Sequence, residues 1–351
     1  MKKIKIVMKG LIMSLLAIGV LTFSGCKEDE FVPTKTLYDL VSADAELSEM
    51  LGYIDADATL KGYAQGTAAY TAFIPNNAAF DKLRETLGIT DLSVVNPAII
   101  SSVINFHFAA GATSAAELTG ASVATVQGES VVGNADGTIL TGCSDTKVEI
   151  LETKELATNG MLHVVGTILI PPTICGTIGV NLGTVAQPIL LGAVFTDVVG
   201  IIAVADIDVP AGELSITEIL ADKSGTAYTV FMPVNDVFAG AAALYGITKE
   251  EFIGSLTTSA AAARGFMLNH ISNAGGVKGS ELVDGKTITM MTGNTYIVAT
   301  STPSPENPLG IVLVNVLDQA KIAPVYQTDL IDAGGSGAGS NGSAHVSSIL
   351  Q

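Results

Sequence analysis

Three cysteines carry the most reactive side chains of this sequence, and their surroundings differ. Cys26 follows a basic start, an apolar run over residues 11–23 and the small residues Ser24 and Gly25. This order is typical of a signal peptide, because a membrane-spanning helix needs roughly 20 apolar residues and this run is shorter. The other two cysteines, Cys143 and Cys175, stand far along the chain as an even pair. The first cysteine is therefore a candidate for modification near a cleavage point, and the other two are candidates for a disulfide bond.

Ser24-Gly25-Cys26 resembles the lipobox of bacterial lipoproteins, with Phe23 where that motif usually has Leu. The resemblance implies that residues 1–25 are a lipoprotein signal peptide and that Cys26 is the lipid attachment site. Two or three acyl chains on one cysteine anchor a protein stably, whereas a single chain holds it only marginally. The alternative is an ordinary signal peptide that is cut nearby, which would leave Cys26 as an unmodified thiol.

Residues 26–35 are expected to form a lipidated cysteine and a charged tether, since Lys27-Glu28-Asp29-Glu30 cannot pack into a core. These four residues also resemble the export signal that sends some lipoproteins of one Gram-negative group to the outer face of the outer membrane. The resemblance implies an outer membrane lipoprotein exposed at the cell surface. A generic acidic spacer, with a chain that faces the periplasm, is the alternative.

The chain has 17 Lys and Arg against 34 Asp and Glu, which gives a net charge of −17. Because a phosphate backbone requires clustered basic residues, nucleic acid is not an expected partner. No sequence motif for a phosphate loop, a dinucleotide site or a nucleophile elbow is present, and the histidines lack metal-ligand spacing. We expect no enzyme activity, no cofactor and no metal. The four histidines are His107, His163, His270 and His345.

Cys143 and Cys175 would share a compartment that permits oxidation if the chain is exported. A disulfide between them requires Cα atoms about 4.4 to 6.8 Å apart, which spacing along the sequence cannot establish. Two separately buried thiols are the alternative.

An internal repeat sets the expected architecture. Residues 70–80 recur at residues 228–238, and the period is too long for a solenoid, so two copies of one domain are expected. Asn77 and Asn235 are placed to cap a helix in each copy, and Thr248 with Glu251 has the spacing of a capping box. Alternating strands follow these helices, which predicts an α+β fold. The apolar run at residues 189–204 is interpreted as one or more buried helices.

Both copies resemble the fasciclin domain through the motif Thr-x-Phe-x-Pro-x-(Asp/Asn)-x-x-Phe at residues 71–80 and 229–238. A second motif, Gly followed by an apolar strand with a histidine, matches Gly160 and His163; in the second copy we assign it to residues 310–314, with Leu313 in place of the histidine. The resemblance implies two tandem fasciclin-like domains, each a twisted β-sandwich or wedge flanked by helices. The expected boundaries are 36–172 for the first domain, 173–182 for a linker, 183–326 for the second domain, and 327–351 for a Gly/Ser-rich, disordered tail.

Fasciclin domains act in adhesion and matrix contact, so the resemblance implies a lipid-anchored interaction protein that binds a matrix, cell-surface or polysaccharide partner. The Tyr-His pair that some animal members use for integrin is replaced by Phe106-His107 and Asn269-His270, and we interpret both histidines as core residues bonded to backbone. A periplasm-facing, non-catalytic subunit of an envelope complex is the alternative function. A glycan or ester hydrolase ranks third.

Overall fold

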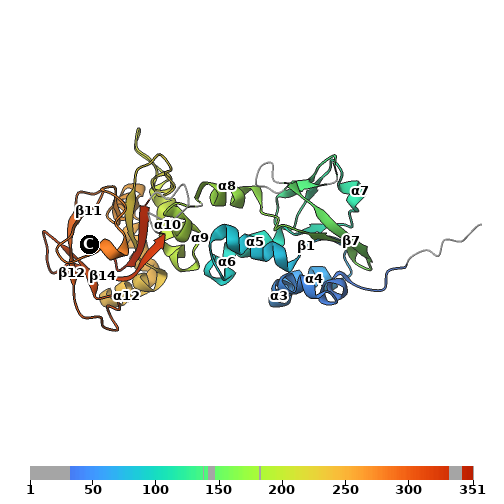
Figure 1. Cartoon of the computed structure of the whole chain (residues 1–351), viewed down its shortest axis with the longest axis horizontal. Helices are drawn as coiled ribbons and strands as arrows, with labels where there is room; N and C mark the ends of the chain where they lie inside the picture. Colours follow the sequence, from blue (N-terminus) through green and yellow to red (C-terminus); the bar gives the residue numbers. More distant parts are fainter. Residues whose placement is uncertain (1–31, 137, 141–146, 182, 332–341, 351) are drawn as a thin grey trace, which may run out of the picture. The chain divides into compact units, whose positions relative to one another are not determined.

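The computed structural model describes residues 32–136, 138–140, 147–181, 183–331 and 342–350. Its contacts divide the chain after Thr34, and every described helix and strand lies in the compact unit Lys35–Gln351. Within this unit a similar order of helices and strands occurs twice, once from α2 to β8 and again from α9 to β15 (Figure 1). The structure is mixed α+β with two domains, which confirms the predicted fold class.

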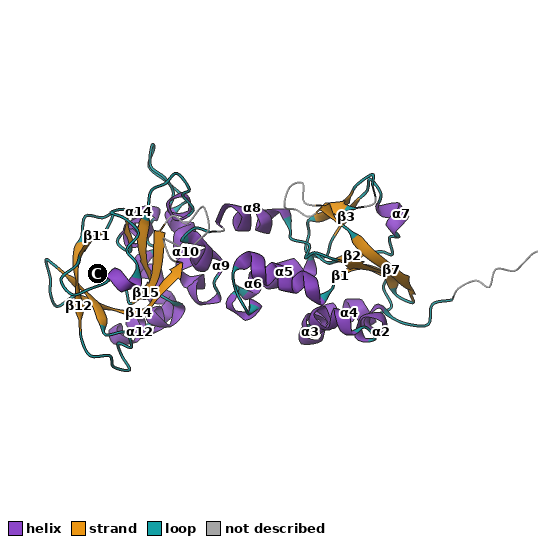
Figure 2. Cartoon of the chain, viewed as in Figure 1, coloured by secondary structure: helices purple, strands orange, loops and turns teal. Residues whose placement is uncertain are grey.

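The first copy begins with helices and ends with strands (Figure 2). Its helical elements are α2 (Leu37–Ser42), η1 (Ala45–Leu47), α3 (Ser48–Ala56), α4 (Ala58–Gln65), α5 (Asn77–Leu87), η2 (Leu92–Val94), α6 (Pro97–Asn105) and α7 (Ala115–Leu118). Its strands are β1 (Tyr70–Pro75), β2 (Phe108–Ala110), β3 (Ser122–Ala124), β4 (Ser130–Gly133), β5 (Ile139–Leu140), β6 (Lys147–Val148), β7 (Ile150–Ala157) and β8 (Gly160–Val165).

The segment expected as a linker forms helix α8 (Pro172–Asn181), and the second copy follows it. Its helical elements are α9 (Ala186–Leu191), η3 (Ala193–Phe195), α10 (Thr196–Ala205), α11 (Ile216–Leu220), α12 (Asn235–Tyr245), α13 (Lys249–Leu256), α14 (Ala260–Leu268) and η4 (Gly279–Glu281). Its strands are β9 (Tyr228–Met232), β10 (Ile271–Ser272), β11 (Thr287–Thr289), β12 (Thr295–Thr300), β13 (Ile311–Asn315), β14 (Ile322–Ile331) and β15 (Gly342–Ser347).

The two copies share one strand order. In the first copy the order is β2-β1-β8-β7, and strands β3 to β6 form a separate four-stranded sheet. In the second copy the order β10-β9-β15-β14 continues through β13 and β12 to β11, because the ten-residue strand β14 pairs with β15 along one part and with β13 along another. The second copy therefore has one seven-stranded sheet where the first has two sheets.

Each central strand divides its side chains between two cores. In the first copy Ile74 packs with the helices, whereas its neighbour Phe73 packs with Val131 and Ile139 of the second sheet. In the second copy Met232 packs with the helices and Phe231 with the strands β11 to β14. Successive side chains of a strand point to opposite faces, so each copy is a helix layer, a central sheet and a covering layer of strands.

The histidine-bearing strand of the second copy was assigned wrongly. Strand β15 runs parallel to β9 with Gly342 opposite Tyr228 and His345 opposite Phe231. This register repeats that of β8 on β1, where Gly160 lies opposite Tyr70. Residues 311–315 instead form β13, which lies between β12 and β14. The small residues Gly342-Ser343-Ala344 do not look like a buried strand in the sequence, yet all of β15 is buried.

The expected end of the second domain at residue 326 and the disordered tail from 327 are wrong for the described part of that segment. Residues 327–331 complete β14, residues 342–347 form β15, and the backbone continues to Leu350 in contact with the core. The Gly/Ser-rich residues 332–341 lie outside the described residues. A composition rich in small residues indicated disorder, but small side chains are also what a closely packed central strand requires.

The two repeated asparagines do not cap their own helices. The Oδ1 atom of Asn77 accepts a hydrogen bond from the N–H of Glu49 at 3.0 Å, at the start of α3, and Asn235 does the same for Asp197 at the start of α10. The cap of α5 is the preceding residue, Asn76, whose Oδ1 accepts from the N–H of Ala79. Asn77 and Asn235 therefore tie two helices together, which a local pattern cannot show.

The apolar run at residues 189–204 forms the end of α9, the short η3 and most of α10, and its residues belong to the helix-side core of the second copy. This confirms the interpretation of buried helices. Among the described residues, no helix combines the length and the apolar character needed to cross a membrane.

Candidate functional site

Two of the four histidines follow the end of a helix and lie in the core, one in each copy. His107 and His270 are fully buried, and each Nδ1 lies 2.8 Å from the carbonyl oxygen four residues earlier. Each Nε2 accepts a backbone N–H, from Leu169 at 3.0 Å and from Leu350 at 2.9 Å. Because Nε2 must offer a lone pair, the proton lies on Nδ1 and both rings are neutral. The prediction of core histidines bonded to backbone is confirmed.

Burial lowers the pKa of His107 and of His270 to about 4 in each case. The charged form of an imidazole loses its hydration in the core, and a proton on Nε2 would face the N–H that this atom now accepts. Neither ring is placed to exchange protons with a substrate near neutral pH.

The other two histidines lie on the central strands β8 and β15. The Nε2 atom of His163 bonds to the carbonyl of Thr113 at 2.9 Å, and that of His345 bonds to the carbonyl of Val277 at 2.8 Å. Each ring stacks on the phenylalanine opposite it in the sheet, with centroids 5.5 and 5.1 Å apart. Burial lowers both pKa values. All four histidines therefore link separate segments of backbone.

Sequence reasoning recognised His163 as part of a strand motif but missed His345 as its counterpart. The signal that identifies both is Gly-x-x-His, in Gly160 to His163 and Gly342 to His345, with the glycine at the first residue of a strand. Among the residues that the structure describes, no group of three or more His, Cys, Asp or Glu side chains could hold a metal ion.

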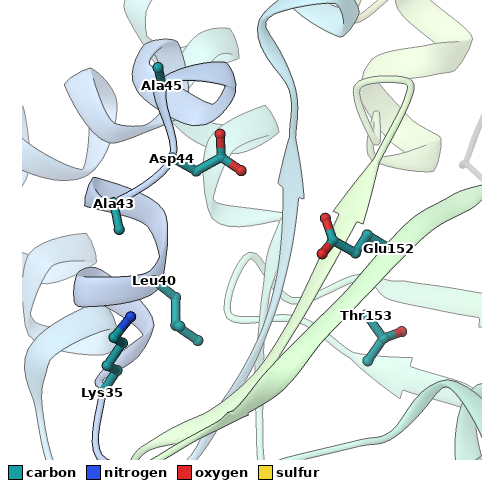
Figure 3. A pocket seen from close by; sticks show the side chains of 7 residues that line it. All are labelled: Lys35, Leu40, Ala43, Asp44, Ala45, Glu152 and Thr153. Atoms are coloured by element: carbon teal, nitrogen blue, oxygen red, sulfur yellow. The ribbon is translucent and has the colours of Figure 1, made fainter.

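A cavity of about 440 Å³ lies between the α2–η1 segment and strand β7 of the first copy. Figure 3 shows the carboxylates of Asp44 and Glu152 pointing into this space from opposite walls, with Leu40 and Lys35 farther down the wall that carries Asp44. Thr153 belongs to the wall, and its hydroxyl lies 3.2 Å from Nδ1 of His163. The remaining lining residues are Ala43 and Ala45.

This cavity is polar and open to solvent rather than a deep apolar pocket of the kind that buries a small ligand. Asp44 already accepts a hydrogen bond from the N–H of Glu46 at 2.9 Å, and so it serves as the cap of η1. The carboxylates that line the cavity suit contact with a polar or cationic group of a partner. Thr153 does place a hydroxyl beside an imidazole, but the Nε2 atom of His163 is bonded to the carbonyl of Thr113, so this ring ties two backbone segments together.

A more distinctive surface lies on the second copy, on the side of β11 to β14 that faces away from the core. One row across these strands joins Thr287, Ile297, Val314 and Ile322, and the next joins Ala299, Val312 and Pro324. Residues directly opposite each other share a face. We call these seven residues the outer face. None of them is charged, and Ile297 and Ile322 are 38% and 57% exposed.

The first copy presents a different surface at the same place. Its corresponding row runs through Ser122 and Val132 to Lys147, so a lysine stands where the second copy has Ile322. Lys147 forms an ion pair with Asp136 at 2.6 Å. An antiparallel sheet that has one face in water normally carries polar residues there, and the first copy, with Ser122 and Lys147 beside Val132, lies closer to that rule than the second.

The cysteine predictions fall largely outside the described residues. Cys26 and Cys143 both lie there. Cys175 lies in α8, where its N–H donates to the carbonyl of Pro171 at 2.8 Å, and it is disulfide-bonded. Its pairing with Cys143 stays a prediction.

The first copy, with its central parallel strand pair and buried histidines, matches a known family. Residues 34–171 contain a fasciclin domain, since they match the family model of that description.

Two mycobacterial proteins are similar to part of the chain. They are the immunogenic protein MPB70 of Mycobacterium bovis and the immunogenic protein MPT70 of Mycobacterium tuberculosis, each 34% identical over 104 residues. The match covers 29% of this chain, and the chain spans about half the length (50%) of these curated relatives. Among solved structures, a FAS1 domain pair from the insect cell adhesion molecule fasciclin I aligns with 87% of this chain and 96% of its own, at 15% identity and a TM-score of 0.36.

Proposed function

We propose that the chain is a non-catalytic adhesion or interaction protein of the cell envelope, which binds a matrix, cell-surface or polysaccharide partner through its fasciclin-like domains. The observation that carries the proposal is the fasciclin domain at residues 34–171, in which both histidines, His107 and His163, bond to backbone. Histidines that stabilise the fold in this way are not available for catalysis. We therefore assign the function to the surface of the domains, through recognition of a partner.

The surface supports this function in two places. The outer face of the second copy exposes uncharged apolar side chains, which are typical of the central part of a protein interface. The polar cavity of the first copy adds Asp44, Glu152 and Lys35, which could bond to hydroxyl or amine groups of a glycan or a protein.

Anchoring rests on the amino-terminal sequence, which lies outside the described residues. The apolar run followed by Ser24-Gly25-Cys26 favours lipid on Cys26, and the charged residues 27–30 favour display at the outer membrane surface. In this proposal Cys26 holds the two domains at the membrane. The alternative is a non-catalytic subunit of an envelope complex that faces the periplasm.

Binding is tested with purified chain on a glycan array and a panel of matrix and envelope components. We expect saturable binding to at least one component, and we expect a charge introduced at Ile297 or Glu152→Ala to weaken it. A matched control is Val132→Lys, at the corresponding and equally exposed position of the first copy. The absence of saturable binding across the panel would count against the function.

Anchoring is tested separately by growing cells with a radiolabelled fatty acid. The full chain is expected to carry the label, and Cys26→Ala is expected to lose it. Label on the Cys26→Ala chain, or none on the full chain, would contradict the lipid attachment while leaving the binding function open.

A further inference from the structure

The second copy contains an insertion between α10 and α11. Helix α10 ends at Ala205 and α11 begins at Ile216, whereas in the first copy Asp57 alone separates α3 from α4. Asp206 satisfies the first turn of α11 as Asp57 satisfies that of α4, with its carboxylate 2.6 Å from the backbone nitrogen of Ile216. Residues 207–215 are therefore an addition to a fold that is otherwise retained, and most of them are exposed.

The insertion is attached to α14 by Arg264. A turn over residues 210–213, closed by a backbone hydrogen bond of 3.0 Å, directs Glu213 back towards this helix. The Nε and Nη2 atoms of Arg264 donate to the same carboxylate oxygen of Glu213 at 3.2 and 2.8 Å, and Nη2 also donates to the carbonyl of Leu214 at 2.8 Å. The first copy, which lacks the insertion, has Ser101 at the position of Arg264 when the copies are aligned on their core histidines.

Arg264 has fewer acceptors than its burial requires. The chain has two arginines, and the terminal nitrogens of the more exposed one, Arg84, donate to both oxygens of Glu49 and to Asp81. Arg264 is only 7% exposed, yet its buried Nη1 atom has no hydrogen-bond acceptor among the described residues. A buried guanidinium with unpaired N–H groups is costly, because these donors have lost water without gaining a partner. The more buried arginine of the chain is therefore the one with fewer partners.

We propose that Arg264 and Glu213 form a binding site for a carboxylate group of a ligand, which bonds to Nη1 of Arg264 beside the carboxylate of Glu213. One guanidinium then holds two carboxylates, as Arg84 holds those of Glu49 and Asp81. The insertion lies against the guanidinium through two of its residues, and it moves to admit the ligand. This goes beyond the proposed function, which uses the outer face and the cavity of the first copy.

Charge and shape favour a carboxylate over other anions. A planar guanidinium matches the planar edge of a carboxylate, and hydrogen bonds between opposite charges are stronger than neutral ones. The chain has a net charge of −17, so it repels a doubly charged phosphate or sulfate more strongly than a singly charged carboxylate. A single bond of this kind binds weakly, and we expect a dissociation constant on the order of 10 mM for a small carboxylate.

The test is nuclear magnetic resonance of the chain from Lys27 onward, which keeps the whole compact unit Lys35–Gln351, with isotope-labelled arginine. Each of the two arginines gives one Nε signal, and the variants Arg84→Lys and Arg264→Lys assign them. Sodium acetate is added from about 1 to 200 mM, with sodium chloride to keep the ionic strength constant. We expect the Arg264 signal to shift until it saturates, while the Arg84 signal stays nearly constant because its terminal nitrogens already bond to two carboxylates.

Two charge variants of the insertion separate direct contact from long-range attraction. Glu213→Gln removes the neighbouring carboxylate and should lower the dissociation constant for acetate about tenfold, because two like charges no longer share one guanidinium. The matched control Asp208→Asn removes an equal charge from an exposed residue of the same insertion that is not among the partners of Arg264. It should change the dissociation constant less than about twofold. Glu213 is 53% exposed, so the fold should survive, which circular dichroism checks.

An Arg264 signal that does not respond to acetate, or that responds equally to chloride alone, would overturn the proposal. Equal shifts of the two arginine signals, equal effects of the two charge variants, or tighter binding of phosphate than of acetate would overturn it as well. Failure here leaves the proposed function untouched, because no variant in this test alters the outer face or the cavity. Failure of the binding panel likewise leaves the carboxylate site untouched, because acetate binding is measured directly.

Discussion

Gly342 begins its strand directly against the carbonyl oxygen of Tyr228, where a Cβ atom would lie only 1.9 Å from that oxygen. Gly160 meets the carbonyl of Tyr70 in the same way, at 1.8 Å, and the two glycines share φ values of +149° and +148°. Both the close approach and the backbone conformation exclude a side chain. This pair of contacts identifies β15 as the counterpart of β8 and fixes the register of the second sheet.

Replacement of either glycine by alanine should therefore destabilise its own copy. We expect Gly160→Ala and Gly342→Ala each to lower the free energy of unfolding by about 3 kcal/mol or more, because backbone must move to admit the methyl group. Urea unfolding followed by circular dichroism measures this. In the control Gly52→Ala, within α3, nothing lies within 4 Å of the added atom, and a gain of about 0.5 to 1 kcal/mol is expected. Equal effects at all three positions would contradict the contact.

The second copy should not survive loss of its last strand. A chain that ends at residue 331 lacks β15, which lies between β9 and β14, so each of these strands loses its partner on that side. We expect hydrogen exchange to show rapid exchange throughout β9 to β14, with β1 to β8 still protected. A disordered tail at this place would instead make the truncation harmless, so unchanged protection in the second copy would refute the assignment.

Acid should weaken both copies through their core histidines. An imidazole with a pKa of about 4 in the fold and about 6.5 unfolded binds fewer protons when folded, so its stabilising effect is complete above pH 6.5 and falls as the pH drops towards 4. Each of His107 and His270 contributes a loss of up to about 3 kcal/mol over this range. Urea unfolding at pH 7.5 and pH 4.5 measures the loss. His270→Gln should reduce the pH dependence of the second copy, and a stability unchanged between these pH values would contradict the neutral rings.

The helix α12 offers a chance to strengthen the second copy. Its N-cap residue Val234 has no side-chain acceptor, whereas Asn76 at the same place in α5 accepts the N–H of Ala79, and the two residues have nearly the same backbone angles. Val234→Thr keeps a similar shape and adds the missing oxygen. We expect a gain of about 0.5 to 1 kcal/mol in the free energy of unfolding. A matched Asn76→Ala should cost about 1 kcal/mol. No loss with Asn76→Ala, together with no gain with Val234→Thr, would refute the assignment of both caps.

The local parts of this fold could be predicted from the sequence, and the long-range parts could not. The motif around Phe73 and Phe231 identifies a strand and a helix in each copy, because strand alternation and helix spacing are properties of short segments. The parallel pairing of β9 with β15 joins segments more than a hundred residues apart, and β15 carries small side chains that local patterns treat as a linker. The Gly-x-x-His signal was available in both copies but becomes meaningful only with the pairing.

The candidate surfaces show the same limit. Alternation over residues 295–300 and 311–315 predicts strands, but only the cross-strand register shows that Ile297, Val314 and Ile322 form one row. The cavity of the first copy is lined by both Asp44 and Glu152, which lie near opposite ends of the first domain in the sequence. Contacts that form through the pairing of distant strands cannot be recognised from the spacing of residues within a short segment.

Labelling of intact cells tests the central proposal, a surface-displayed interaction protein held by Cys26, most directly. The measurement is the accessibility of an epitope placed after Gln351 to an antibody, before and after the cells are permeabilised, with Cys26→Ala as the control. Full labelling of the unchanged chain on intact cells, lost from the cells in the control, is the predicted result. Labelling that requires permeabilisation would contradict surface display and favour a subunit that faces the periplasm.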